Sequence, residues 1–341
     1  MNIWHSFCMN KPRIKLKRRI APLVISVILI ILILISISVG SSSVSLWEAV
    51  RSLFKGEWKS TQFKIVFLIR LPRIIGAILA GGALAVSGII IQAVLNNPMA
   101  SPSIIGVNSG AGFFVILAMA IFPSTLEALP IVAFAGSLLA SLLIYVVSMS
   151  TGAGTVTITL IGIAVGSILN AGINTVKALF PNSVYDISGF LIGGLSLVSF
   201  GDILPASVII VPCLIAAFVL CRSLDILSLG QEMAQGLGMN VKRSRITWLM
   251  LASALAGSAV SYVGLIGFVG LIVPHIMRRI VGSSHKHLIL SSRIGAGVLL
   301  LGADLLSRVL FAPYELPAGI ILSLVGGPFF IFLVINGRKS K

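Results

Sequence analysis

Side chains able to do acid–base, nucleophilic or metal chemistry are scarce in this sequence. The 341 residues include 9 Asp and Glu, 4 His and 3 Cys. The cysteines, Cys8, Cys213 and Cys221, are odd in number and lack metal-ligand spacing, so they predict neither a disulfide framework nor a metal site. The sequence also has no paired carboxylates, no nucleophile–base set and no GxxxxGK[ST] phosphate loop. We therefore expect no enzymatic activity, no cofactor and no nucleotide bound in the usual way.

His275 is a candidate ligand or proton relay, because it follows Pro274 inside an apolar segment. However, no second His, Cys or carboxylate lies nearby at ligand spacing. The sequence therefore favours a hydrogen-bonded histidine near a helix end.

Basic residues are the largest group with a distinct chemistry, since 25 Lys and Arg give a formal net charge of +16. Such a charge can indicate nucleic-acid binding. Here the basic residues stand between long apolar runs rather than on one soluble domain, which is typical of the cytoplasmic loops of membrane proteins. We therefore predict a membrane-lipid environment and no nucleic-acid partner.

The elements that carry these residues are predicted to be membrane helices. Hydrophobic residues make up 57% of the chain and charged residues 10%, with a mean hydropathy of +1.10. A soluble domain carries about 25% charged residues. The 34 glycines suit closely packed membrane helices. An all-α integral membrane protein is the fold class that this composition predicts.

Apolar runs give the number of helices. Residues 21–39 form a run of about nineteen apolar residues, long enough to cross a bilayer and longer than the core of a signal peptide. Residues 74–126 and 128–176 are free of charge and each allow two crossings with a turn. Further runs cover residues 203–221, 246–263, 265–280, 288–311 and 316–335.

The segment from residue 246 to 277 decides the topology. Basic residues flank both of its ends, so both ends prefer the cytoplasm. Two short crossings with a tight turn near Gly264 and Gly267 satisfy this preference, whereas one helix does not. The total is about ten helices, with a cytoplasmic N-terminus over residues 1–20 and a cytoplasmic C-terminus.

This topology leaves a crowd of basic residues in the outer segment that precedes the second helix, namely Arg51, Lys55, Lys59, Lys64, Arg70 and Arg73. Residues 41–69 are predicted to be an outer interfacial segment. Within it Val44, Trp47, Val50 and Phe54 recur at spacings of three and four, which favours a surface-lying helix over a solvated loop.

Three stretches resemble the FecCD family of ABC permeases, which includes the cobalamin permease. They are residues 70–112, beginning RLPRIIGAILAGG, residues 229–238, LGQEMAQGLG, and residues 267–282, GFVGLIVPHIMRRIVG, followed by ELPAG at 315–319. The resemblance implies one transmembrane permease domain over residues 1–341 in a bacterial inner membrane. It also implies three kinds of partner: a second permease, identical or paralogous, two cytoplasmic ABC ATPases, and an extracytoplasmic substrate-binding protein or lipoprotein. Iron–siderophore cargo is favoured, and cobalamin or haem remains the alternative.

The resemblance also assigns roles to the arginines. Arg70, Arg73 and Arg308 match family positions that dock onto acidic residues of the binding protein. Planar guanidinium groups suit this role because they bind carboxylates bidentately. Two other interpretations are open: the arginines could reach lipid headgroups, and Asp304 could pair with Arg308 at i,i+4.

Two inner regions complete the family pattern. Residues 222–245 match the loop that couples the permease to the ATPase, although Gln231 stands where relatives often have an acidic residue. The candidate coupling residues are Gly230, Glu232, Ala234, Gly236 and Gly238. Helix interruptions and the turn at 152–157, which matches a cytoplasmic gate of the cobalamin permease, give the candidate gate or pathway residues Asn97, Pro98, Thr155, Val156 and Pro274.

A secondary transporter is the competing class of function. Such a protein normally needs buried acidic residues near the middle of the membrane to couple ions. The first eight predicted helices contain almost none, and Asp304 lies toward an outer helix end. The sequence therefore favours transport driven by ATP hydrolysis in a separate subunit.

Overall fold

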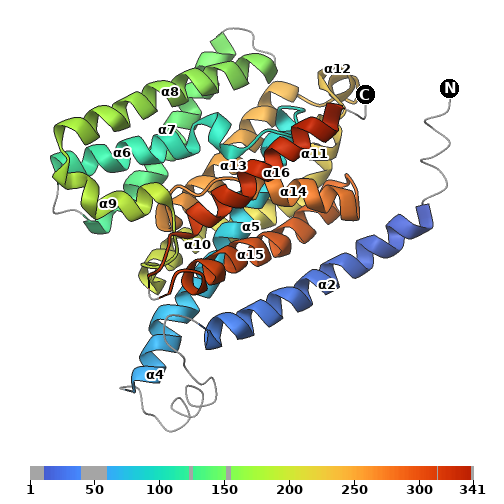
Figure 1. The fold of residues 1–341 in the computed structure, drawn as a ribbon. Helices are drawn as coiled ribbons and strands as arrows, with labels where there is room; N and C mark the ends of the chain where they lie inside the picture. Colours follow the sequence, from blue (N-terminus) through green and yellow to red (C-terminus); the bar gives the residue numbers. More distant parts are fainter. Residues whose placement is uncertain (1–10, 40–59, 123–125, 151–154, 313, 339–341) are drawn as a thin grey trace.

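The computed structural model describes residues 11–39, 60–122, 126–150, 155–312 and 314–338, and every regular element in these ranges is a helix (Figure 1). The long helices are α2 (Lys11–Ser38), α5 (Leu71–Val94), α6 (Val107–Ile121), α7 (Leu129–Ser150), α8 (Thr155–Leu179), α10 (Phe200–Val219), α13 (Val241–Val263), α14 (Val269–Val281), α15 (His285–Val309) and α16 (Ala318–Arg338). The shorter elements are α4 (Thr61–Phe63), η1 (Lys64–Arg70), η2 (Pro102–Ile105), η3 (Leu126–Ala128), α9 (Asn182–Ile192), α11 (Cys221–Leu227) and α12 (Gln231–Gly236).

The predicted all-α membrane fold is confirmed. Within the described ranges, 7 helices are long and apolar enough to cross a membrane. α6 and α16 are shorter apolar helices, and α14, with 13 residues, is a further short helix. Together these helices are compatible with the predicted number of about ten.

Helix α5 is the centre of the bundle, because α13, α14 and α15 all pack against it (Figure 1). Its sequence is rich in Gly and Ala, and its face toward these helices is almost completely buried. Small residues let the backbones approach closely: a Cβ on Gly88 would overlap the carbonyl oxygen of Gly270 in α14. Close backbone contact therefore holds α5 and α14 together.

The turn between α13 and α14 lies where the sequence predicted it. Gly264 caps α13 with a φ of +74°, which glycine adopts without strain. Phe268, the N-cap residue just before α14, has a φ of +65°, an unusual value for a bulky residue. Its ring packs directly against Gly326 of α16, where a Cβ would collide with it. Packing against α16 thus accompanies the strained start of α14.

The helix that contains α5 begins before Leu71. α4, η1 and α5 follow one another without a break from Thr61 to Val94. Part of the predicted outer segment 41–69 is therefore a helical extension of α5. Residues 41–59, with the predicted surface helix at 44–54, lie outside the described residues.

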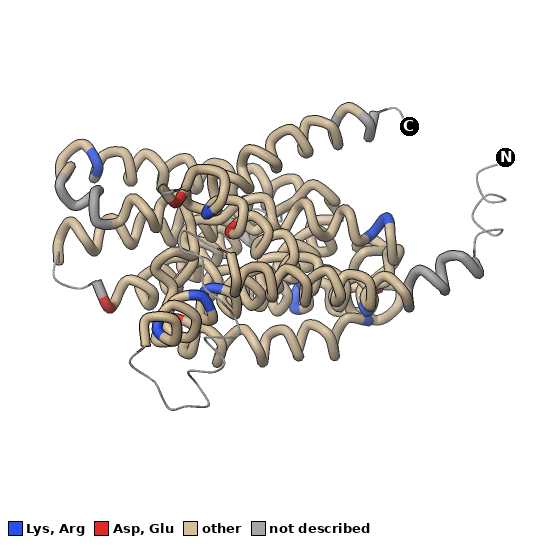
Figure 2. The backbone as a smooth tube through the Cα atoms, turned by 60° about the horizontal axis from the view of Figure 1, so that its bottom comes forward, with Lys and Arg blue, Asp and Glu red and all other residues tan. Residues whose placement is uncertain are grey.

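The bundle has two chemically different ends. The arginine end contains Arg70, Arg73 and Arg308. The α12 end contains α12, the start of α2 and the close of α16 (Figure 1). Figure 2 shows that the charged residues of the described chain lie mostly near helix ends and connections, while the helical rods between them are nearly free of charge.

Candidate transport sites

Three predicted docking arginines meet at the arginine end. Asp304 is fully buried and binds two of them: its Oδ1 lies 2.7 Å from Arg73 Nε, and its Oδ2 lies 3.0 Å from Arg308 Nη2. Arg73 Nη1 also donates to Glu315 Oε2 at 2.9 Å. A single buried carboxylate therefore neutralises guanidinium groups from two helices, and Glu315 supplies a second negative charge.

The same cluster attaches α2 to the bundle. Arg70 Nη1 donates to the carbonyl oxygen of Ile37. Arg308 Nη2 donates to Ser36 Oγ at 2.6 Å. The arginine side chains are only 3–5% exposed in this chain, so they face the protein interior. Three arginines against two carboxylates leave the cluster with excess positive charge.

The predicted coupling region contains the short helix α12, which packs against α11 and α13. We call α11 the platform. Gly230 and Gly238 stand on either side of α12 with φ values of +100° and +80°, which explains glycine at both positions. Ala234 is buried against the bundle, whereas Glu232 and Gly236 are exposed. Two large apolar side chains, Met233 and Leu237, are each 62% exposed. α12 therefore presents apolar side chains outward at the end of the bundle.

Two polar contacts hold the platform, α11, against the bundle. Trp248 Nε1 of α13 donates to Ser223 Oγ of α11 at 3.1 Å. At the start of α15, His285 Nδ1 lies 2.6 Å from Asp225 Oδ1, which also accepts from the backbone N–H of His285. The coupling region is thereby attached to both α13 and α15.

The predicted gate residues lie on three different segments of the chain. Asn97 Oδ1 accepts from the backbone N–H of Met99 at 2.9 Å, and Pro98 is exposed in the turn after α5. Pro274 is buried within α14. Thr155 is the first residue of α8 and Val156 is 70% exposed, while residues 151–154 lie outside the described chain.

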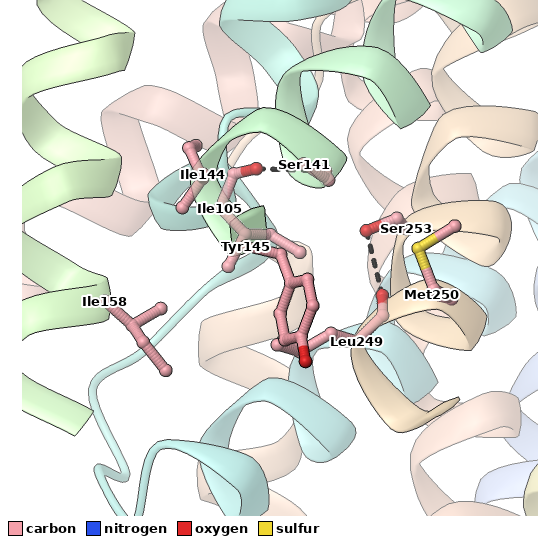
Figure 3. A pocket seen from close by; sticks show the side chains of 8 residues that line it. All are labelled: Ile105, Ser141, Ile144, Tyr145, Ile158, Leu249, Met250 and Ser253. Carbon is pink, nitrogen blue, oxygen red and sulfur yellow. Dashed lines mark hydrogen bonds between the residues drawn. The ribbon is translucent and has the colours of Figure 1, made fainter. Parts of the chain in front are cut away.

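The buried face of α8 is tightly packed near its first turn. There a cavity of about 10 Å³, roughly the size of one water, lies between α7, α8 and α13. Figure 3 shows Tyr145 lying between Ile158 and Leu249 in this cavity. The Tyr145 hydroxyl has no hydrogen-bond partner among the described residues.

His275 differs from the prediction. Its Nε2 is buried without a hydrogen bond in the described chain, and its ring contacts Phe329 edge-on, with 6.1 Å between ring centroids. The predicted hydrogen-bonded role is therefore wrong. Aromatic packing against α16, which the local sequence does not show, occupies the ring instead.

A larger groove opens beside α8, between this helix and the η2–α6 segment. Its volume is about 440 Å³, within the range of small-molecule sites. Hydroxyl and amide side chains supply much of its lining, and none of its lining residues is charged. The polar lining residues are Ser103, Asn108, Ser109, Ser167 and Asn170.

The polar side of the groove continues along α8. Ser167, Asn170, Asn174 and Lys177 follow one another at spacings of three and four, so they lie along one stripe of the helix. The first three are exposed in this chain. Leu160 and Ile168 are also exposed, at 61% and 70%. α8 thus has an open face that is partly polar, although its length and hydropathy suit a membrane span.

Comparison with known proteins identifies the family. Residues 28–336 match the profile of the FecCD transport family. This chain belongs to the FecCD transport family. It is 39% identical to the Fe(3+)-citrate import system permease protein YfmE of Bacillus subtilis (strain 168), over 97% of this chain and 100% of the relative. It is 35% identical to the hemin transport system permease protein HmuU of Yersinia pestis, over 85% of this chain and 89% of the relative.

A solved structure supports the same assignment. The inward-facing structure of a metal-chelate type ABC transporter matches this FecCD chain with a TM-score of 0.82 and 27% identity, covering 92% of this chain and 98% of the other. The predicted family and fold are therefore confirmed.

Sequence reasoning found part of the site in this FecCD protein and missed part. It anticipated the pairing of Asp304 with Arg308, because four residues separate them. It missed the bond from Arg73 to Asp304, which joins residues 231 positions apart. It also missed the groove, although the spacing of Ser167, Asn170 and Asn174 was a usable signal in an otherwise apolar helix.

Proposed function

We propose that this chain is the membrane-spanning permease subunit of an ATP-driven importer for a ferric chelate, and that the groove beside α8 forms part of the translocation path. A second permease, two cytoplasmic ABC ATPases and an extracytoplasmic binding protein complete the transporter. Membership of the FecCD transport family supports the class of function. The polar stripe on the open face of α8 is the observation that supports the path.

The physical argument concerns where such a stripe can face. Amide side chains are costly to expose to hydrocarbon, because lipid offers no hydrogen-bond partners. Asn170 and Asn174 make no hydrogen bond within the described chain. A hydrated path or a polar cargo satisfies these groups, whereas lipid does not. The apolar neighbours Leu160 and Ile168 suit contact with the second permease or with lipid.

The chemistry of the groove indicates a class of cargo. Hydroxyls and amides supply hydrogen-bond donors, Lys177 adds a cation toward the arginine end, and no carboxylate lines the groove. A chelate with acceptor oxygens on its outer surface is complementary to such a lining. Permeases for Fe(3+)-citrate and for hemin are among the relatives, and both names are consistent with an iron-containing cargo. Ferric citrate or an oxygen-rich siderophore is favoured here, with haem or cobalamin as the alternative.

The arginine end is the proposed docking face for the binding protein, which places it outside the cell and the two termini in the cytoplasm. Glu315 is the partner of Arg73 nearest to solvent, since its side chain is 28% exposed. A carboxylate of the binding protein would compete with Glu315 for Arg73, and the excess positive charge of the cluster favours this exchange. Arg70, Arg73 and Arg308 then act through a shared network rather than as three free side chains.

At the other end, α12 is the proposed contact with the ATPase. Its exposed Met233 and Leu237 are suited to an apolar cleft on that subunit. Movement of α12 would reach the bundle through α11, which is bonded to α13 and α15. The proposed gate positions are Thr155 and Val156 at the start of α8 and Asn97 and Pro98 in the turn after α5, and we expect such movement to rearrange them.

The decisive experiment measures uptake of radioactive ferric citrate into proteoliposomes containing the whole transporter. ATP with a functional ATPase should be required, and an inactive ATPase should abolish uptake even when an ion gradient is present. Uptake driven by the gradient alone would contradict the proposal and favour a secondary transporter.

The path is tested in the same assay with the double variant Asn108→Leu with Asn170→Leu. We expect at least a tenfold loss of uptake with ATP hydrolysis changed less than twofold. Thr175→Val is the matched control, because Thr175 is exposed on the same helix but its hydroxyl already bonds to the Ala171 carbonyl. Normal uptake by the double variant would exclude this groove from the path.

A further inference from the structure

Two adjoining grooves lie on the lateral surface of the bundle, away from α8. One groove, of about 200 Å³, runs between α10 and α15. The other, of about 290 Å³, adjoins α2, α5, α10 and α15. Both are lined by Leu214, Ile215 and Arg293, so they meet at the same three residues. All remaining lining residues are apolar.

Arg293 is an unusual residue for this position. It is the ninth residue of α15, which places it about 12 Å from the beginning of that helix. Its side chain is exposed and its aliphatic stem lies over Gly82 of α5. Within the part of the chain that is described, its guanidinium has no carboxylate within ion-pair distance and no hydrogen-bond acceptor. A cation within a membrane helix needs a counter-charge or contact with the interface.

Other basic residues lie toward the α12 end of the same surface. Lys286, Leu290 and Arg293 recur at spacings of four and three, so they share one exposed face of α15. Arg222 belongs to α11, and that helix packs against α15. Lys286 and Arg293 therefore put two positive charges on the face of α15 that borders the grooves.

We propose that these two grooves form a binding site for one anionic glycerophospholipid, with its acyl chains in the grooves and its phosphodiester bound by Arg293 and Lys286. The combined shape and charge favour this ligand. Apolar grooves accept acyl chains. Arg293 and Lys286 supply cationic hydrogen-bond donors at the level where the acyl chains of the lipid meet its headgroup. A neutral lipid would fill the grooves but leave the charge of Arg293 uncompensated.

Lipid binding here would also link separate parts of the fold. Ile215 belongs to α10, Leu29 to α2 and Ile78 to α5, and all three contact the grooves. α2 is otherwise a peripheral helix, with 11% of the residues in its most apolar stretch buried. An anionic lipid between α2, α10 and α15 would therefore hold α2 against the bundle.

The test uses the purified whole transporter in detergent, titrated with dioleoylphosphatidylglycerol or dioleoylphosphatidylcholine. Binding is followed by native mass spectrometry, and thermal unfolding is followed in parallel. We expect phosphatidylglycerol to bind at least tenfold more tightly than phosphatidylcholine to the unmodified chain and to raise its unfolding temperature.

Arg293→Gln should lower the affinity for phosphatidylglycerol about tenfold and leave phosphatidylcholine binding unchanged. The matched control is Arg279→Gln, because Arg279 is exposed on α14 and lines neither groove. A second variant, Ile215→Trp, fills the grooves without changing charge and should weaken both lipids. If Arg293→Gln cannot be purified, Ile215→Trp tests the site alone.

Two results would overturn the proposal. One is wild-type affinity for phosphatidylglycerol in both Arg293→Gln and Ile215→Trp. The other is displacement of phosphatidylglycerol by inorganic phosphate at millimolar concentration, which would show that the ion rather than the lipid is recognised. Neither result depends on transport activity, so both are independent of the proposed function.

Discussion

At the scale of single residues, Asp304 is the most consequential side chain in the described chain. It is completely buried and forms ion pairs with Arg73 and Arg308. A buried ion pair is not a strong source of net stability, but removing one partner leaves the other charge uncompensated. The cluster therefore makes the arginine end sensitive to any change at this carboxylate.

Asp304→Asn should destabilise the protein by about 3–5 kcal/mol, because two guanidinium groups lose a buried counter-charge. Glu315→Gln is the control: its side chain is partly exposed, so we expect an effect of about 1 kcal/mol or less. Thermal unfolding of purified protein in detergent measures both. Equal stability of the two variants would contradict the assigned roles.

The contact between Arg73 and Glu315 also predicts how a substitution at Glu315 changes docking. If a carboxylate of the binding protein replaces Glu315 at Arg73, then Glu315→Gln frees Arg73 and should strengthen docking. We expect the dissociation constant of the binding protein to fall several-fold, as measured by surface plasmon resonance at low salt, where charge pairs are least screened. Weaker docking in Glu315→Gln would mean that Glu315 supports the docking surface instead of competing for it.

At the scale of helices, glycine positions control how closely α5 approaches its neighbours. A Cβ on Gly88 would overlap the backbone of Gly270, and neither helix backbone can move without disturbing the core. Gly302 of α15 has nothing within 4 Å of the corresponding point. Substitution by alanine should therefore have opposite effects on stability at these two helical glycines.

Gly88→Ala should prevent stable assembly or lower the unfolding temperature strongly, because the helices must separate to admit the methyl group. Gly302→Ala should be neutral or slightly stabilising, since alanine favours the helix and meets no neighbour. Yield and thermal unfolding of the two purified variants provide the comparison. A stable Gly88→Ala protein would show that α5 and α14 have room to move apart.

The helices themselves were largely predictable from the sequence, for a clear physical reason. An uninterrupted apolar run in a membrane must be a helix, because lipid offers no partner for free backbone groups. The break near Gly264 was also predicted, because the flanking basic residues favoured two short helices over one; that both of these helices cross the membrane stays a prediction. Contacts between helices were not predictable in this way. Neither the Arg73–Asp304 bond nor the packing of His275 on Phe329 leaves a local pattern in the sequence.

At the scale of the whole molecule, α15 connects the arginine end with the α12 end. It begins at His285, which is bonded to Asp225 of α11, and its last turns contain Asp304 and Arg308. Between these ends it packs along α5, where a Cβ on Gly81 would collide with the backbone of Ala296. α5 and α15 therefore form one stiff unit about 37 Å long, reaching from the platform to the arginine cluster.

This unit predicts how the two ends communicate. If displacement of α12 passes through Asp225 and His285 into α15, then Asp225→Asn should weaken the link without disturbing either terminal site. The neutral amide still accepts a hydrogen bond from His285 but loses the charge-assisted part of the contact. We expect normal assembly with the ATPase and normal docking of the binding protein, combined with loss of most of the stimulation of ATP hydrolysis by the loaded binding protein.

Ser223→Ala is the control for this prediction, because it removes the parallel hydrogen bond from Trp248 to α11 while leaving the contact with α15 intact. Stimulation should then change less than twofold. If both variants lose stimulation equally, the platform acts as a whole and α15 has no special part in transmission. If neither loses it, the signal travels by another route, and the long α5–α15 contact serves only to hold the bundle together.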